Sequence, residues 1–196
     1  MFRKVNIRLI KTLWRASHYS TSHSEKWISS FGASLGIGSV FIVAFVFQHV
    51  GILSDHEITY WLLPCFGATS VLLFAIPHSP FSQPWPVLGG YFFSMVSGEL
   101  SVHFLDDSQM QAIWGVALAV LSMCYFRCLH PPGAAATLVP VLSGSSNWYF
   151  VFNPVLLGAI SLMGMAVVYN AFFSWRRYPM LLAAHKNESG KVSGPK

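Results

Sequence analysis

Two long apolar runs constrain this sequence most strongly. Residues 28–53 and residues 150–175 each exceed the roughly 20 residues that a helix needs to cross a bilayer. Shorter apolar stretches lie between them, at residues 60–77, 84–105, 112–126 and 133–142. The stretch at 60–77 is interrupted at Pro64 and Gly67, and the stretch at 133–142 is too short to cross alone. We therefore expect an all-α, polytopic membrane helix bundle of about six membrane segments, two of them broken or re-entrant.

The composition agrees with a membrane protein. Hydrophobic residues make up 54% of the chain and charged residues only 10%, and the mean hydropathy is +0.52. Soluble domains usually carry about 25% charged residues, so this chain has too few charges to solvate a globular surface. Its 196 residues suffice for one membrane domain. No basic stripe runs through a folded face, so we expect the lipid bilayer as a partner and no nucleic acid.

The basic residues are concentrated at the two ends of the chain. Only Arg127 lies between the first and the last apolar run. Basic residues favour the cytoplasmic side of a membrane, so both termini are predicted to be cytoplasmic, and a bacterial inner (plasma) membrane is the expected location. Six crossings satisfy this rule, whereas five would export Arg176 and Arg177. Four crossings with two re-entrant segments satisfy it equally, so both counts stay open.

The charge pattern divides the chain into three parts. Residues 1–27 alternate apolar and basic side chains at helical spacing, which predicts a cytoplasmic amphipathic segment on an anionic membrane surface. An organelle transit peptide is the alternative for this segment. Residues 28–175 form the predicted transmembrane domain, and residues 176–196 form a basic cytoplasmic tail.

The sequence contains a candidate internal repeat. Gly67-Ala68-Thr69-Ser70 is similar to Gly133-Ala134-Ala135-Ala136, at an offset of 66 residues. Pro86-Val87-Leu88 with Gly90 matches Pro154-Val155-Leu156 with Gly158, at an offset of 68. Two halves of three crossings each would insert with opposite orientations, as in the inverted repeats of many secondary transporters. Re-entrant segments would instead give parallel halves.

The segment from Arg127 to Thr137 is the sharpest candidate site. Pro131 and Pro132 block continuation of the preceding helix, and Pro132 suits the first turn of a new one. A helix that begins there directs N–H groups toward whatever lies before it, which favours an anion. The same residues are also compatible with a tight turn followed by a small-residue helix contact. The predicted substrate-binding residues are Gly67, Ala68, Thr69, Ser70, Arg127, His130, Pro131, Pro132, Gly133, Ala134 and Thr137.

These motifs resemble the HPP family of integral membrane proteins. The resemblance lies in His130-Pro131-Pro132-Gly133-Ala134-Ala135-Ala136-Thr137, in residues 67–74 and in residues 79–90, and it covers roughly residues 25–175. It implies a membrane domain with a transport role, and plastid and cyanobacterial members are linked to nitrite uptake. The family is commonly described with four spanning helices, which agrees with six segments only if two are re-entrant.

Other polar residues suggest further chemistry. Glu99 lies inside an apolar stretch, where a carboxylate is costly, so it is predicted to be neutral, paired with His103 one turn on, or part of a proton path. Cys124, Cys128 and His130 are close in sequence but lack a second Cys/His pair with zinc spacing, so we expect buried thiols, no metal and no cofactor. No nucleotide-binding or hydrolase motif is present, so enzyme activity is not expected.

The function predicted from the sequence is therefore transport. We expect a transporter or channel for a small inorganic anion, with nitrite suggested by the resemblance, and with Glu99 and His103 as candidates for proton coupling. The alternative is a non-transporting membrane sensor or assembly module that uses the same motifs for packing. A homo-oligomer would suit so small a transporter, although no motif identifies one.

Overall fold

A computed structural model describes residues 22–51, 61, 63–144 and 146–180. These residues form helices and connecting segments, with no strand among them. The predicted amphipathic segment before residue 22 and the tail after residue 180 lie outside the described residues. The helices are α2 (His23–His49), α3 (Pro64–Ala75), η2 (Pro80–Ser82), α4 (Pro84–Phe104), α5 (Ser108–Tyr125), α6 (Pro131–Ala136), α7 (Leu138–Ser143), η3 (Val151–Leu156) and α8 (Leu157–Ala171).

Polar caps set the starts of two long helices. The Ser22 hydroxyl accepts a hydrogen bond from the Glu25 N–H, so α2 begins at His23, five residues before the apolar run. The Asp107 carboxylate accepts from the Met110 N–H at 2.9 Å, so α5 begins at Ser108, four residues before its apolar run. Both helices begin before their apolar runs, because side chains that cap a helix satisfy its first N–H groups and lie outside the apolar pattern.

Prolines begin the two short helices. Helix α3 begins at Pro64, three residues before Gly67, and α6 begins at Pro131, so Pro132 lies in its first turn as the sequence indicated. Proline is favoured there because its fixed φ suits a helix and its missing N–H is not needed. Helix α6 runs into α7 through Thr137, whose φ of −54° and ψ of −30° are helical, and α7 ends at Gly144 with a φ of 65°. Residues 131–143 thus form one short, nearly continuous helix.

The last apolar run does not form one regular helix. The π-helical segment η3 (Val151–Leu156) is interrupted at Asn153, which leaves the helical region with φ −130° and ψ 116°. Pro154 explains this break because a proline disfavours the helical conformation of the residue before it. The regular helix α8 therefore begins only at Leu157.

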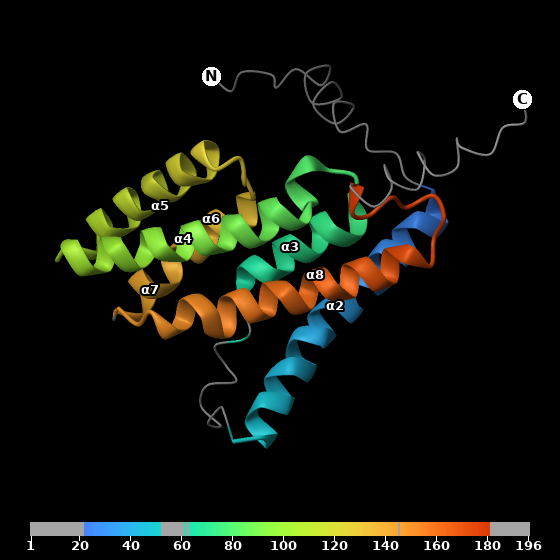
Figure 1. Cartoon of the computed structure of the whole chain (residues 1–196), viewed down its shortest axis with the longest axis horizontal. Coiled ribbons are helices and arrows are strands. Elements are labelled where there is room, and N and C mark those ends of the chain that lie inside the picture. The colour runs from blue at the N-terminus through green and yellow to red at the C-terminus, as the bar shows by residue number, and fades with distance from the viewer. Residues whose placement is uncertain (1–21, 52–60, 62, 145, 181–196) are drawn as a thin grey trace, which may run out of the picture.

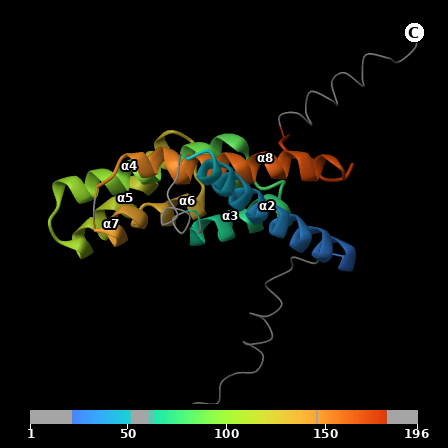
Figure 2. The same ribbon diagram turned by 90° about the horizontal axis from the view of Figure 1, so that it is seen from below.

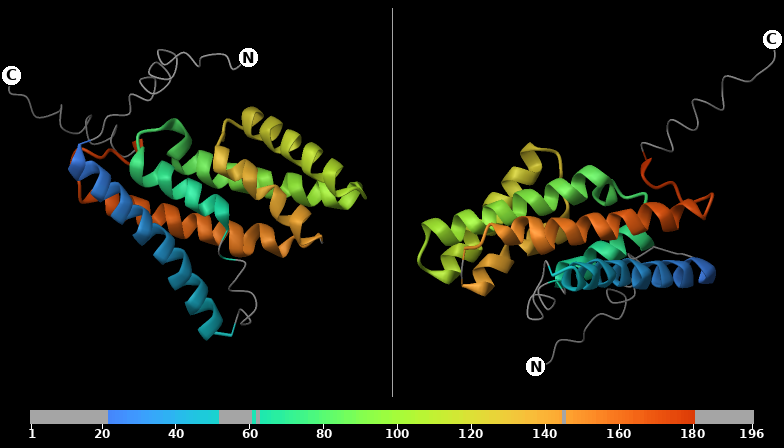
Figure 3. Two further views of the ribbon diagram at one scale, coloured as in Figure 1. Left: turned by 180° about the vertical axis from the view of Figure 1, so that it is seen from behind. Right: turned by 60° about the horizontal axis from the view of Figure 1, so that its bottom comes forward.

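Two long helices organise the bundle. Figure 1 shows α4 and α8 running along it in opposite directions, with α5 beside α4 and with α2 crossing α8. The short helices α3 and α6–α7 lie on one side of this pair (Figure 3, left). Helix α3 packs on α2 and α8, whereas α6 and α7 pack on α4. Helix α3 therefore lies beside α8, and α6–α7 lie beside α4. The short helices also meet each other, because α3 contacts α6.

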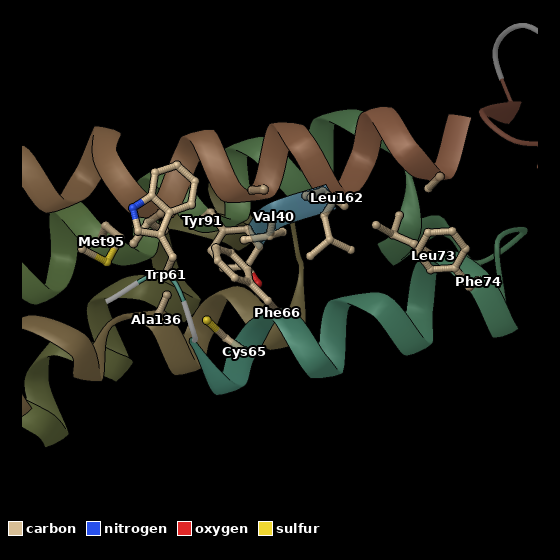
Figure 4. Close-up of a cluster of buried hydrophobic side chains, with 14 of the residues drawn as sticks. Val40, Trp61, Cys65, Phe66, Leu73, Phe74, Tyr91, Met95, Ala136 and Leu162 are labelled. Atoms are coloured by element: carbon tan, nitrogen blue, oxygen red, sulfur yellow. The ribbon is translucent and has the colours of Figure 1, made fainter. Parts of the chain in front are cut away.

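The core lies where these helices meet. Figure 4 shows Trp61, Met95 and Ala136 close to Tyr91 and Phe66, around the start of α3. Each of these side chains is 1% exposed or less. The outer faces of α2 and α5 are instead apolar and exposed, as for Ile42 (64%) and Trp114 (62%). A large exposed apolar surface is expected where lipid replaces water as the surrounding medium.

Two helices among the described residues are long and apolar enough to cross a membrane, judged by length and composition. They are α2 and the helical run from Val151 to Ala171, while α3 is apolar but shorter. The start of α2 and the end of α8 lie at one end of the bundle, and the α4–α5 connection lies at the other (Figure 2). The two ends of the described chain are therefore on the same side of the fold.

Candidate functional site

His130 is the centre of the site and caps the start of α6. Its side chain is fully buried, and both ring nitrogens have partners. Nδ1 lies 2.8 Å from the Phe81 carbonyl oxygen, and Nε2 lies 2.8 Å from Oγ1 of Thr69. Because a carbonyl only accepts, Nδ1 carries the proton and donates it, and Nε2 of a neutral ring then accepts from the Thr69 hydroxyl.

A chain of hydrogen bonds continues from Thr69. Thr69 Oγ1 lies 2.8 Å from the Tyr91 hydroxyl. Thr69 and Tyr91 are both fully buried. These hydrogen bonds join α3, α4 and the start of α6, and His130 connects them to Phe81 in η2. A buried network in which every group has a partner fixes the elements that carry it.

Glycines allow the close approach that this network requires. A Cβ on Gly90 would lie 2.5 Å from the Cβ of His130, and a Cβ on Gly133 would lie 2.9 Å from the Gly90 carbonyl carbon. Distances this short do not occur between real side chains and backbone. The glycines of the His130 motif and of α4 are therefore needed for packing of α6 against α4.

The start of α6 offers few free donors. Pro131 and Pro132 have no N–H, and the Gly133 N–H donates to the His130 carbonyl at 2.8 Å. The N–H groups that the sequence suggested for an anion are thus largely absent or occupied at this point. An anion near this helix start would depend on side-chain donors.

The structure separates several of the predicted site residues. Thr69, Ser70, His130, Pro132, Gly133 and Thr137 are buried, whereas Gly67, Ala68, Arg127 and Pro131 are exposed and Ala134 is half-buried. Arg127 lies in the α5–α6 connection with a φ of 53°. Thr69 and His130 are brought into direct contact, while Gly67 and Ala68 lie on the outer face of α3.

A second buried polar group lies in α4. Glu99 is fully buried, and its Oε2 accepts a hydrogen bond from the Ser146 hydroxyl at 2.8 Å. Its Oε1 has no hydrogen-bond partner among the described residues, and the same is true of Oγ1 of Thr137. His103, the predicted partner of Glu99, is exposed and packs edge-on against the Phe104 ring. A carboxyl group buried in a membrane domain is a candidate for proton or ion handling.

The cysteines do not form a cluster of metal ligands. Among the described residues, no group of three or more His, Cys, Asp and Glu side chains is placed to hold a metal ion. Cys65 and Cys128 are buried, Cys124 is exposed, and all three thiols are free.

A buried charge that sequence reasoning missed lies after α8. Arg176, interpreted as the first residue of a cytoplasmic tail, is only 5% exposed, and its Nη2 lies 2.6 Å from Oε2 of Glu25. A signal was present: Glu25 is the one acid before the first apolar run, and Arg176 follows the last run directly. The sequence alone does not reveal that α2 and α8 bring them together.

Comparison with known proteins identifies the family. The family model for the HPP transmembrane region matches residues 18–179. This chain belongs to the HPP family. The family prediction is confirmed, and with it the assignment of the chain as an integral membrane protein.

Two relatives of this HPP protein are transmembrane proteins of Dictyostelium discoideum. One is 31% identical over a region covering 79% of this chain and 49% of the relative, and the other is 33% identical over 61% of this chain and 44% of the relative. The chain thus spans about half the length of the relatives it matches. No solved structure matches it.

Proposed function

We propose that this HPP protein is a transporter or channel for a small inorganic anion. The observation that carries the proposal is the crossed packing of its two short helices. Helix α6 of the second half packs on α4 of the first half, where Gly90 meets His130. Helix α3 of the first half packs on α8 of the second half, where Gly158 meets the ring of Phe66.

This packing supports the 3+3 repeat proposed from the sequence. In such a repeat α2 corresponds to α5, α3 to α6–α7, and α4 to α8. The contact between α2 and α8 then corresponds to the contact between α5 and α4, and both are present. The contact of α2 with α3 becomes that of α5 with α6–α7. A Cβ on Gly32 would meet Tyr169, and one on Gly115 would meet Ser101. Ser101 and Tyr169 are 68 residues apart, the same offset as that of the repeated Pro-Val-Leu motif.

The directions of the chain support an inverted repeat. The α3–α4 connection lies at the end of the bundle that contains the start of α2, and Ser146 of the α7–η3 connection contacts Glu99 near the opposite end. Inverted halves with short helices at their interface are a common plan for alternating access. The basic residues favour the cytoplasmic side for the end that carries the start of α2.

A small anion is the solute class that we propose. Gly90 and Gly133 bring backbone against backbone at the junction of α4 and α6, where even a methyl group does not fit, so a small solute requires the least separation of these helices. Arg127 is the one Lys or Arg between the first and last apolar runs and supplies a positive charge beside α6. Nitrite is the first candidate because of the roles linked to other family members.

Proton coupling through Glu99 is part of the proposal. The carboxyl group is buried, has a single neutral hydrogen-bond donor, and belongs to the helix on which α6 and α7 pack. Taking up a proton removes the cost of burying its charge, so movement of the α7–η3 connection that exposes Glu99 would couple to proton release.

Anion flux into proteoliposomes tests this function. Purified protein in liposomes should accelerate uptake of nitrite over protein-free liposomes, with nitrate, formate and chloride tested in parallel. Arg127→Gln should reduce uptake several-fold, whereas Arg177→Gln, a matched change at another exposed arginine, should not. Protein-free rates for all four anions would reject anion transport.

The alternative is a non-transporting membrane module, and one observation favours it. His130 is satisfied by Phe81 and Thr69, as a purely structural residue would be. This reading requires that water never reaches the contact between α6 and α4. Chemical access to Thr137, whose hydroxyl is buried without a partner, separates the two functions.

A further inference from the structure

Arg176 joins three helices at one end of the bundle. Its Nη2 donates to Glu25 Oε2 at 2.6 Å and to Ser29 Oγ at 2.9 Å, both in α2. Its Nη1 donates to the Phe74 carbonyl of α3 at 2.8 Å and to Asn170 Oδ1 of α8 at 3.2 Å. The side chain is only 2% exposed.

These contacts close the carboxyl end of α3. The last carbonyls of a helix lack partners in the helix and carry its negative dipole, so a cation there is stabilising. Arg176 donates to the Phe74 carbonyl, and Asn170 Nδ2 donates to the Leu73 carbonyl at 3.2 Å. Glu25 supplies the counter-charge that a buried guanidinium requires. The end of α3 is therefore tied to both α2 and α8 by one charged side chain.

The opposite end of the bundle is held differently. The residues that the structure describes contain no ion pair at that end. Gln111 Nε2 donates to the Leu105 carbonyl at 2.7 Å, and Ser146 donates to Glu99. A hollow of about 400 Å³ lies between α4 and α5, beside Phe104, Leu105 and Trp114. The two ends of the bundle are therefore held by different interactions. An ion pair joins the helices at one end, and hydrogen bonds from neutral donors join them at the other.

We propose that Glu25 and Arg176 form an ion-pair gate that holds this end of the transport path closed. The proposal rests on the transport function above, because a gate requires a path to close. Since Glu25 is partly exposed, with 26% of its side chain accessible, it is the partner that can leave the pair and take up water. Release of Arg176 would remove the side chain that ties the end of α3 to both α2 and α8, and would leave the Asn170 bond to the Leu73 carbonyl.

Chemical access to Ser70 tests the gate. Ser70 is buried in α3, about one and a half turns before its end, so Ser70→Cys reports opening of that end. In protein with Cys65→Ala, Cys124→Ser and Cys128→Ala, a membrane-impermeant maleimide is added on the side of the α2 start. Glu25→Gln and Arg176→Gln are compared with the matched control Arg177→Gln, because Arg177 is exposed beside Arg176.

The gate predicts that Glu25→Gln and Arg176→Gln each raise the labelling rate at least tenfold, while Arg177→Gln leaves it unchanged. Parent-like labelling in both gate variants would overturn the proposal. Aggregation of both variants on size exclusion would also overturn it, because a gate opens without loss of the fold. The labelling experiment does not require anion flux, so it can be separated from the uptake experiment. Faster labelling of the gate variants in a protein that takes up no anion would reject the transport function. Unchanged labelling of the gate variants in a protein with normal anion uptake would reject the gate.

Discussion

Oγ1 of Thr69 in α3 lies 2.8 Å from Nε2 of His130 at the start of α6, although 61 residues separate them. This hydrogen bond joins the two short helices of the bundle. Tyr91 of α4 lies next in the same network, 2.8 Å from Thr69. The His130 motif therefore links α6 to both α3 and α4 through buried hydrogen bonds and ring contact.

Removing the Thr69 hydroxyl should weaken this junction. Thr69→Val keeps the shape but leaves His130 Nε2 and the Tyr91 hydroxyl without their partner, at a cost of about 1–3 kcal/mol in the free energy of unfolding. Thermal unfolding in detergent measures the loss. Ser122→Ala is the control, because that hydroxyl is exposed and bonds only within its own helix. Equal stability of both variants would contradict the role of the network.

Glycine substitutions should separate close helix contact from helix propensity. Gly90→Ala and Gly133→Ala should each destabilise the protein by about 1–3 kcal/mol, because the added methyl group collides with His130 or with backbone. Gly164→Ala in α8 has open space around it and should be neutral or up to about 1 kcal/mol more stable. Thermal unfolding in detergent ranks the three variants. If Gly90→Ala were as stable as Gly164→Ala, the close packing at Gly90 would be refuted.

Glu99 should determine the response to a proton gradient. Glu99→Gln cannot release a proton, so nitrite uptake should lose its dependence on an imposed pH difference across the membrane. His103→Gln, a change at an exposed side chain on the same helix, should keep that dependence. Uptake by proteoliposomes with and without a pH difference gives the comparison. A Glu99→Gln protein that still responds to the gradient would exclude Glu99 as the coupling residue.

A path between the short helices should make Thr137 reachable from water. Thr137→Cys should react with a small charged thiol reagent, and nitrite should slow the reaction by occupying the path. Asn147→Cys, in an exposed connection, should react without protection by nitrite. Reaction at Asn147 with none at Thr137 would favour the packing module over the transporter.

The sequence predicted local features better than contacts across the chain. Prolines predicted the starts of the short helices, because a proline acts on its own backbone and its neighbours. The apolar runs did not reveal the capped starts of α2 and α5, because Ser22 and Asp107 lie outside the apolar pattern. The bend at Asn153 was also missed, although the following Pro154 was a local signal for it.

At the site, too, the sequence indicated individual residues better than the contacts between them. Thr69 and His130 were singled out as anion-binding residues and Glu99 as a proton-coupling residue, and all three are buried. The hydrogen bond between Thr69 and His130 was not predicted, because it depends on how α3 and α6 pack. Apolar runs do not specify that packing. Arg176 was assigned to a tail because charge at the end of an apolar run usually marks an interface. Its burial depends on Glu25, which lies 151 residues earlier.

The proposed anion path requires that two oppositely inserted halves of the protein meet at Thr69 and His130. Side-specific labelling of single cysteines at His78 and Asn147 tests this arrangement, because both positions are exposed and each follows a short helix, α3 or α7. If the two halves are inserted in opposite orientations, an impermeant maleimide should reach the two cysteines from opposite sides of the membrane. Labelling of both from the same side would contradict the inverted repeat and the path built on it.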